Sequence, residues 1–191
     1  MAVTTSGRPR DLEIDRAVLS AVREHLAVHG LAGLSIAAVA EDAGTTRATI
    51  YRRWPDKLTL ALASIADLAE KEPPKPTDNP LKDLTAELTH FRQCITDASS
   101  LALAGVMLQN EIDPKFQRSY RKLLVEPRRA RILACLERGI LKGQIAADSD
   151  IALAASFATG SWYAFSISGN TPPKDWAERT AQLIWKAVAK K

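Results

Sequence analysis

The chain has 191 residues, of which 46% are hydrophobic and 25% charged, and its formal net charge is +4. This balance is typical of a soluble globular protein and excludes an intrinsically disordered one, and the length suffices for one medium-sized or two small domains. Cys94 and Cys135 stand apart, without the spacing of a metal site or a disulfide framework. We therefore expect a reducing, cytoplasmic setting and neither a metal nor a cofactor.

The longest uncharged run, residues 151–173, is interrupted by serine, threonine and glycine. Its apolar part is shorter than the roughly 20 residues that a membrane-spanning helix needs. The first residues of the chain also lack the apolar run of a secretory signal. The sequence therefore predicts neither a membrane segment nor a signal peptide.

The first predicted helix runs from Asp11 to His29, where apolar residues recur at the helical period. Ser35 can cap the N-terminus of a short second helix, and Gly44 can supply the left-handed residue that ends it. A third short helix begins near Thr46. It ends by Trp54, because the proline that follows disfavours the helical conformation there.

A fourth helix is expected over residues 56–70, with an aspartate as its N-cap. Four prolines fall within residues 71–80, so we predict a proline-rich loop that separates two regions. Helical patterns return over residues 81–97, 101–112, 114–142, 148–168 and 175–190. Pro127 is expected to force a kink or a restart. Because no stretch alternates like a strand, the sequence predicts an all-α fold of about nine helices.

The third predicted helix lies within TTRATIYRRWPDK, Thr45–Lys57, and has a small apolar side and a broad basic one. On a helical wheel, Ile50 and Trp54 fall together. The opposite side carries Thr45, Ala48, Thr49, Arg52 and Arg53, with Tyr51 at its border. Residues 44–57 hold four positive charges and one negative charge. Short side chains beside arginine let a helix backbone approach a partner closely.

A solvated surface helix is the alternative interpretation of this basic side. However, two short helices joined by a glycine-centred turn form a helix-turn-helix, in which the first helix supports the second so that its outward side can enter the major groove of DNA. Arginine can bind guanine through two hydrogen bonds, and threonine can contact a thymine methyl group or a base edge. These properties favour DNA recognition.

Residues 34–63, LSIAAVAEDAGTTRATIYRRWPDKLTLALA, resemble the DNA-binding segment of the TetR family of transcriptional regulators. The usual Val-Ser of the family is here Thr45-Thr46, and its usual Phe is Trp54. The resemblance covers about Asp11 to Ala63. It implies a helix-turn-helix DNA-binding domain over residues 11–55, with residues 56–70 as a connecting helix.

The resemblance also implies which residues lie at the DNA. These are Ser35, Thr46, Arg47, Thr49, Tyr51, Arg52 and Lys57, to which the helical wheel adds Thr45, and Arg8 and Arg10 would lie on a flexible basic arm, residues 1–10. We expect Thr49 and Arg52 to read bases, and Ser35, Tyr51, Lys57 and Arg47 to hold the phosphate backbone. The arm either reaches the backbone or minor groove or is simply a solvated tail.

Residues 148–168 are apolar around nearly their whole circumference, so the helix that they form must be covered on all sides. A second copy of the chain is the simplest additional cover. We therefore infer a homodimer through a four-helix bundle made by the last two helices of each subunit, with a buried monomer core helix as the alternative. The predicted dimer contacts are Ala155, Thr159, Trp162, Tyr163, Ile184 and Val188.

The segment EPRRARILACLERGILKGQIAADSDIALAASFATGSWYAF also resembles the C-terminal domain of one TetR subgroup. The resemblance implies a ligand-binding and dimerisation domain over residues 81–191, in a repressor that binds a near-palindromic operator in double-stranded DNA and is released by a small-molecule effector. The candidate pocket residues are Phe91, Met107, Leu108, Glu111, Tyr120, Leu124 and Trp162, each of which an ordinary core also explains.

Two other classes of protein fit less well. An enzyme is not expected, since His25 and His29 have no accompanying metal motif and the sequence lacks a phosphate-binding glycine loop. A helical protein-interaction or small-molecule-binding domain without operator-specific DNA binding is the other alternative. A salt titration separates this alternative from DNA binding, because the logarithm of the binding constant for DNA falls linearly with the logarithm of the salt concentration.

Overall fold

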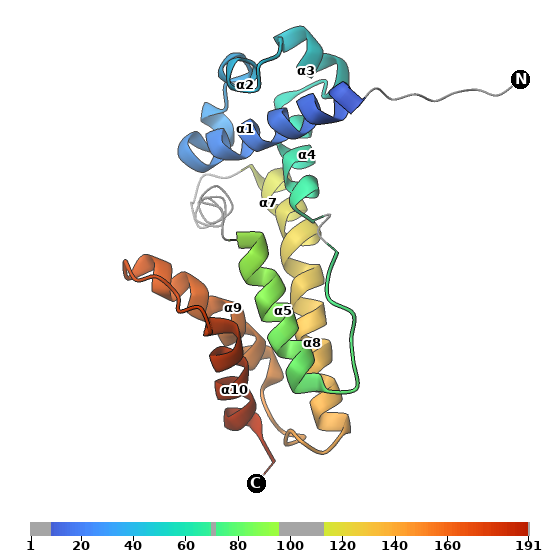
Figure 1. Ribbon diagram of the computed structural model, residues 1–191, viewed down its shortest axis with the longest axis vertical. Coiled ribbons are helices and arrows are strands. Elements are labelled where there is room, and N and C mark those ends of the chain that lie inside the picture. Colours follow the sequence, from blue (N-terminus) through green and yellow to red (C-terminus); the bar gives the residue numbers. More distant parts are fainter. Residues whose placement is uncertain (1–8, 70–71, 96–112, 191) are drawn as a thin grey trace, which may run out of the picture. The chain divides into compact units, whose positions relative to one another are not determined.

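The computed structural model describes residues 9–69, 72–95 and 113–190 (Figure 1). Its described part forms two compact units, one from residues 9–69 and 113–124 and the other from residues 72–95 and 125–190. Both units are helical. The only β-type pairing in the described part is an isolated bridge between Ile145 and Ala189. The predicted all-α fold class is confirmed.

The first unit contains α1 (Pro9–Gly33), α2 (Ile36–Asp42), α3 (Arg47–Arg53), α4 (Lys57–Ala69) and α7 (Pro114–Tyr120). The predicted signals for the short helices are in place. Ser35 Oγ accepts a hydrogen bond from the Ala38 N–H at 3.3 Å, and Gly44 follows α2 with a φ of 61°. α1 extends past its predicted end through a kink at Gly30, which adopts a φ of 64° that glycine tolerates without strain.

The core of the first unit is built on one side of α1. Val18, Val22 and Leu26 form its buried stripe and belong to a single hydrophobic cluster with Val39 of α2 and residues of α3, α4 and α7. Burial of each large aliphatic side chain contributes about 1.5–3 kcal/mol. The short helices α2 and α3 are too short to be stable alone, so they depend on this packing.

The second unit contains α5 (Pro80–Ile95), α8 (Glu126–Leu141), α9 (Ile151–Ile167) and α10 (Trp176–Val188). α5 packs against both α8 and α10, as Figure 1 shows. Leu84, Leu88 and Phe91 lie on its predicted inward side and are fully buried. α5 is therefore the central helix of this unit.

The restart predicted at Pro127 takes the form of a wider helical turn. A π-helical segment, Arg121–Val125, lies directly before α8. Proline has no N–H to donate, and its ring would clash with the carbonyl four residues earlier in a regular α-helix. A π turn removes this conflict by adding a residue to the turn. The chain thus continues in a helical conformation past the proline.

The predicted proline-rich loop is non-helical over residues 72–79, and Pro80 already belongs to α5. Its end is held by the buried Asp83, whose carboxylate accepts hydrogen bonds from the Thr77 N–H at 2.9 Å and the Thr77 hydroxyl at 2.7 Å. Arg138 of α8 donates to the same carboxylate at 2.5 Å. Burial alone would raise the pKa of Asp83, but the hydrogen bonds from Thr77 and Arg138 outweigh it and lower that pKa.

An aromatic cluster fills the core of the second unit. The rings of Trp162 and Trp176 meet edge to face with centroids 4.9 Å apart, and Phe91 and Tyr163 complete the cluster. The guanidinium of Arg128 lies 4.7 Å from the Phe91 ring centroid. Burial raises the pKa of the Tyr163 phenol. Such aromatic pairs contribute about 0.5–1.5 kcal/mol beyond the area that they bury.

Three of the predicted dimer contacts are already buried within the single chain. Trp162 is only 9% exposed within its own chain, and Ala155 and Ile184 are buried as well. These residues form the inner side of α9 and α10, whereas the outer side exposes Phe157 and Leu183. The sequence could not distinguish the two sides of α9, because an uncharged helix has no polar side from which its orientation can be read. Thr159, Tyr163 and Val188 are half-buried and stay predictions.

The described candidate pocket residues come from both units. Phe91 and Trp162 belong to the aromatic cluster of the second unit, whereas Tyr120 is buried in the hydrophobic core of the first unit and Leu124 packs against that core. Met107, Leu108 and Glu111 lie outside the described residues. Whether any of these residues lines a ligand pocket stays a prediction. None of the described helices is both long and apolar enough to cross a membrane.

The aromatic cluster makes the stability of the second unit depend on Phe91. We expect Phe91→Ala to lower the free energy of unfolding by about 3–5 kcal/mol, because it removes a fully buried ring and leaves a cavity. Leu141→Ala, at an exposed leucine of α8, is the matched control and should change stability by at most about 0.5 kcal/mol. Urea unfolding followed by tryptophan fluorescence measures both variants. Equal losses of unfolding free energy in Phe91→Ala and Leu141→Ala would contradict the assigned core.

The lowered pKa of Asp83 predicts a specific acid response. Because the folded state favours the carboxylate, the stability that this group contributes is present above its ordinary pKa of 3.8 and is lost as the pH falls through the lower folded value. We expect the unfolding free energy of Asp83→Asn to fall less steeply than that of the wild type between about pH 5 and about pH 2. If the unfolding free energies of the wild type and Asp83→Asn fell in parallel over this pH range, Asp83 would not anchor the loop.

Candidate nucleic-acid interface

The turn between α2 and α3 is closed by local hydrogen bonds. The Thr45 N–H donates to the Ala40 carbonyl at 2.9 Å, and the Gly44 N–H donates to the Glu41 carbonyl at 3.1 Å. Thr46 then caps α3, because its Oγ1 accepts from the Thr49 N–H at 3.2 Å. These bonds fix the direction in which α3 leaves the turn. The unit is a helix-turn-helix, as the sequence predicts.

Two apolar residues hold α3 on the core of its unit. Ile50 is only 1% exposed, and Trp54, half-buried just after α3, packs against the same hydrophobic cluster. The wheel prediction that these residues form the inner side of the helix is confirmed. Since both anchors lie on one side, the opposite side of α3 must face outward.

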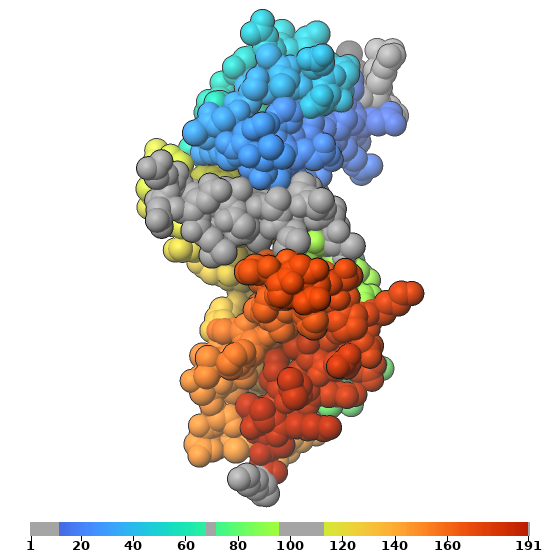
Figure 2. Space-filling model, turned by 90° about the vertical axis from the view of Figure 1, so that its left-hand side faces the viewer, coloured from blue at the N-terminus to red at the C-terminus, as the bar shows by residue number. Residues whose placement is uncertain are grey.

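The outward side of α3 exposes most of the residues predicted to contact DNA. Arg47, Ala48, Tyr51 and Arg52 are exposed, and Thr49 is half-buried. Thr46 and Thr49 are joined by a hydrogen bond between their Oγ1 atoms at 3.0 Å. Figure 2 shows the region of α2 and α3, in light blue to cyan, at the surface of the first unit. A basic helix side without an acidic residue can dock against phosphates and base edges.

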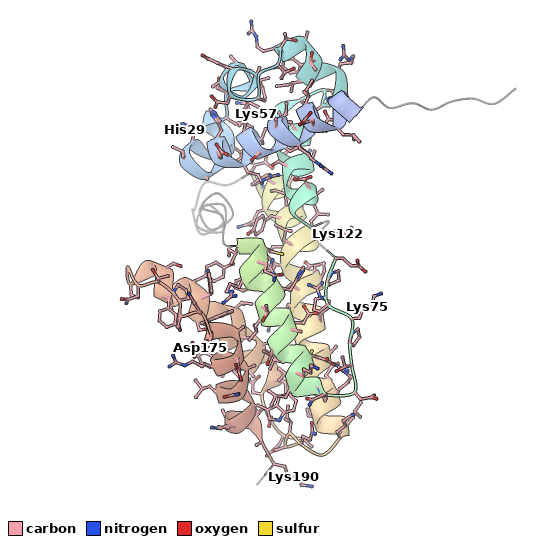
Figure 3. All side chains as sticks on the ribbon, viewed as in Figure 1. His29, Lys57, Lys75, Lys122, Asp175 and Lys190 are labelled. Atoms are coloured by element: carbon pink, nitrogen blue, oxygen red, sulfur yellow. The ribbon has the colours of Figure 1, made fainter. Side chains whose placement is uncertain are left out.

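The predicted phosphate contacts outside α3 lie at two helix ends. Ser35 is exposed at the N-terminus of α2. Lys57 begins α4, and its ammonium donates to the Ala32 carbonyl near the end of α1 at 3.3 Å (Figure 3). Asp56 caps α4 by accepting from the Thr59 N–H at 2.7 Å. Lys57 therefore lies beside the helix-turn-helix, and its contact with phosphate stays a prediction.

One arginine of α3 does not join the outward side. The helical wheel places Arg53 there, but its guanidinium forms an ion pair with Asp15 of α1. The two side chains are only 24% and 26% exposed. A helical wheel gives the direction of the Cα–Cβ bond and takes no account of an acidic residue on a neighbouring helix. Arg53 is therefore a contact between helices.

The last two residues of the predicted basic arm, Pro9 and Arg10, belong to a helix. α1 begins at Pro9, so the backbone of Arg10 is already helical, and proline is favoured at such a first position. Arg8 lies outside the described residues. Any reach of Arg10 toward DNA would therefore start from a helix end.

Sequence reasoning missed the polar contacts that hold the outer helices on α1. His25 Nε2 lies 2.7 Å from Asp42 Oδ2 at the end of α2, and Arg23 binds Asp67 of α4 at 2.7 Å. These partners are separated by 17 and 44 positions. No local pattern could reveal them, although charged residues bordering the apolar stripe of α1 were visible as candidates.

In comparisons with known proteins, both parts of the chain match models of the same kind of regulator. Residues 18–64 match the family described as bacterial regulatory proteins, tetR family, and residues 74–184 match the tetracyclin repressor-like C-terminal domain. The chain is 28% identical over 184 residues to YdeS, an uncharacterized HTH-type transcriptional regulator of Bacillus subtilis, covering 95% of this chain and 93% of that one. An uncharacterized HTH-type regulator of Mycobacterium tuberculosis is 26% identical over 137 residues, 72% of this chain and 66% of the relative.

Solved structures share the fold. HlyIIR, a hemolysin II transcriptional regulator, superposes with a TM-score of 0.68 at 18% identity over 95% of this chain and 99% of its own. A TetR-family regulator from Agrobacterium tumefaciens gives a TM-score of 0.69 at 17% identity over 94% and 100%. The sequence matches span both the helix-turn-helix and the C-terminal helices. The chain therefore belongs to the TetR family of DNA-binding transcriptional regulators.

Proposed function

We propose that this regulator is a homodimeric repressor that binds a near-palindromic operator and is released by a small-molecule effector in the cytoplasm. The observation that carries the proposal is the orientation of α3, which buries Ile50 and exposes Arg47 and Arg52 on the opposite side. A helix held in this way can enter the major groove. Two copies related by twofold symmetry would read two half-sites.

Within α3, we assign base reading to Arg52 and Thr49. The guanidinium of Arg52 is exposed near the end of the helix and can make two hydrogen bonds to guanine. Thr49 is on the same side, and its hydroxyl is already bonded to Thr46, so its methyl group is suited to meet a thymine methyl. The proposed backbone contacts are Ser35, Thr45, Thr46, Arg47, Tyr51 and Lys57.

The dimer surface that we propose is the outer side of α9 and α10. Phe157 is 62% exposed and Leu183 is 71% exposed, and Leu153 is exposed one helical turn before Phe157. Gly160 and Ala164 continue the exposed side of α9 and have little or no side chain to keep a partner helix away. Large apolar groups gathered in this way indicate an interaction surface. A second copy presenting the same surface would cover it by twofold symmetry.

Release by an effector is proposed from family membership. The described part of the second unit contains a hollow of about 430 Å³, lined in part by the ion pairs Asp83–Arg138 and Glu87–Arg131. Because these four charged side chains already pair with one another, we do not assign the effector to it. Among the candidate pocket residues, Phe91 and Trp162 are in edge-to-face ring contact.

The proposed function is tested by isolating the genomic fragments that the purified protein retains and sequencing them. We expect a shared near-palindromic site. Arg52→Ala should then relax base preference at one position of each half-site and weaken operator binding by about 1–3 kcal/mol, and Thr49→Ala should act in the same direction. Arg16→Ala, at an exposed arginine of α1, is the matched control. Operator affinities of Arg52→Ala and Thr49→Ala equal to that of the control would exclude the assigned reading residues.

The dimer surface is tested by Phe157→Arg. Since Phe157 is exposed in the single chain, we expect this variant to stay folded and to sediment as a monomer, because dimerisation would bury an unpaired charge. Leu141→Arg places the same charge at another exposed apolar position and should leave the dimer intact. Analytical ultracentrifugation makes the comparison. A Phe157→Arg protein that remains dimeric would rule out this surface.

A further inference from the structure

Thr46 and Thr49 are joined by two hydrogen bonds. Thr46 Oγ1 accepts from the Thr49 N–H at 3.2 Å, and the two Oγ1 atoms lie 3.0 Å apart. The first bond caps α3, just as Ser35 caps α2 by accepting from the Ala38 N–H. The second bond joins two hydroxyls and has no counterpart in α2, because Ala38 has no side-chain oxygen. Capping alone does not require this second bond.

The bond between the hydroxyls fixes the orientation of the Thr49 side chain. A threonine in a helix divides between two χ1 rotamers, because its hydroxyl can bond a carbonyl of the preceding turn. The bond to Thr46 selects the rotamer in which the Thr49 hydroxyl points to the cap of α3. Since Cβ is chiral, the position of the hydroxyl determines the position of the methyl group. Thr46 therefore orients both groups.

The two groups of Thr49 would read DNA differently. A hydroxyl turned toward the bases can donate or accept, so it fits several base edges and selects weakly among them. A methyl group instead finds an apolar partner in the major groove in the C5-methyl group of thymine. A Thr49 whose hydroxyl is already bonded within the protein should therefore select for thymine.

We propose that Thr46 is a positioning residue that makes Thr49 selective for thymine. By binding the Thr49 hydroxyl, Thr46 leaves the methyl group as the part of Thr49 that meets the base. Position 46 thereby influences the base preference at one position of each half-site without contacting that base. This inference rests on the proposed docking of α3 in the major groove, and it gives Thr46 a role beyond the backbone contact assigned to it above.

The test replaces thymine by uracil, which lacks only the C5-methyl group. The probe is the operator recovered from retained genomic fragments, with each thymine of one half-site replaced in turn by deoxyuridine. For the wild type, we expect one replacement to weaken binding about fourfold through the loss of a methyl contact with Thr49. Thr49→Ser keeps the hydroxyl but has no methyl group, so it should be insensitive to that replacement. This comparison identifies the base that Thr49 reads.

The role of Thr46 is tested at that base. Glycine is well tolerated at an N-cap, so Thr46→Gly removes the hydroxyl and leaves the start of α3 in place. We expect the ratio of thymine to uracil affinity to fall below about twofold, because a released hydroxyl can bond the O4 atom that both bases share. Thr46→Ala should give the same low ratio, whereas Thr46→Ser, which keeps the hydroxyl, should retain the wild-type ratio. A lost phosphate contact would lower both affinities equally and leave the ratio unchanged.

A second background assigns the effect to the Thr49 hydroxyl. Thr49→Val replaces that hydroxyl by a methyl group, and valine has one strongly preferred rotamer in a helix. The variant should therefore distinguish thymine from uracil as the wild type does. Adding Thr46→Gly to Thr49→Val should leave the ratio unchanged, since no hydroxyl remains to be released. Thermal unfolding measured by circular dichroism confirms that each variant is folded at the assay temperature.

The outcomes separate this inference from the proposed function. The role of Thr46 would be overturned by a wild-type ratio in Thr46→Gly, by an equal loss of the ratio in the Thr49→Val background, or by a wild type without a uracil-sensitive position. Specific binding of the operator by the wild type would stand in each case. A wild-type protein that binds the operator no more tightly than a duplex of random sequence would overturn both.

Discussion

The contact on which the DNA-binding unit depends is the burial of the apolar stripe of α1. Val18, Val22 and Leu26 are removed from water only if α2, α3 and α4 cover them. Through Ile50, the same burial decides which side of α3 faces outward. The functional surface is thus a consequence of core packing. A helix of seven residues has too few internal hydrogen bonds to hold this orientation without it.

The polar contacts fix where the short helices begin and end on this core. The caps at Ser35 and Thr46 fix where α2 and α3 begin, and the ion pair of Arg53 with Asp15 fixes where α3 ends on α1. Each such contact contributes little to total stability compared with the core. Their effect on function is larger, since small displacements of a recognition helix change which bases its side chains reach.

Most of the helices, and the inner side of α3, could be predicted from the sequence. Caps, prolines and the apolar period are local signals, and Ser35, Gly44 and Pro127 each had the predicted consequence. The helical wheel misplaced Arg53 because the partner is on another helix, 38 positions away. The sequence also could not show that Trp162 packs on Phe91 and Trp176 within its own chain, because an uncharged helix has no polar side that marks its orientation.

We propose that Arg52 reads the major groove of DNA from the outward side of α3. Dimethyl sulfate methylates the N7 atom of guanine in that groove, so protection from methylation reports this contact directly. We predict protected guanines in both halves of the bound site for the wild type, and loss of that protection in Arg52→Ala at concentrations that still saturate the DNA. Unprotected guanines in the wild-type complex, or a protection pattern unchanged in Arg52→Ala, would contradict the account.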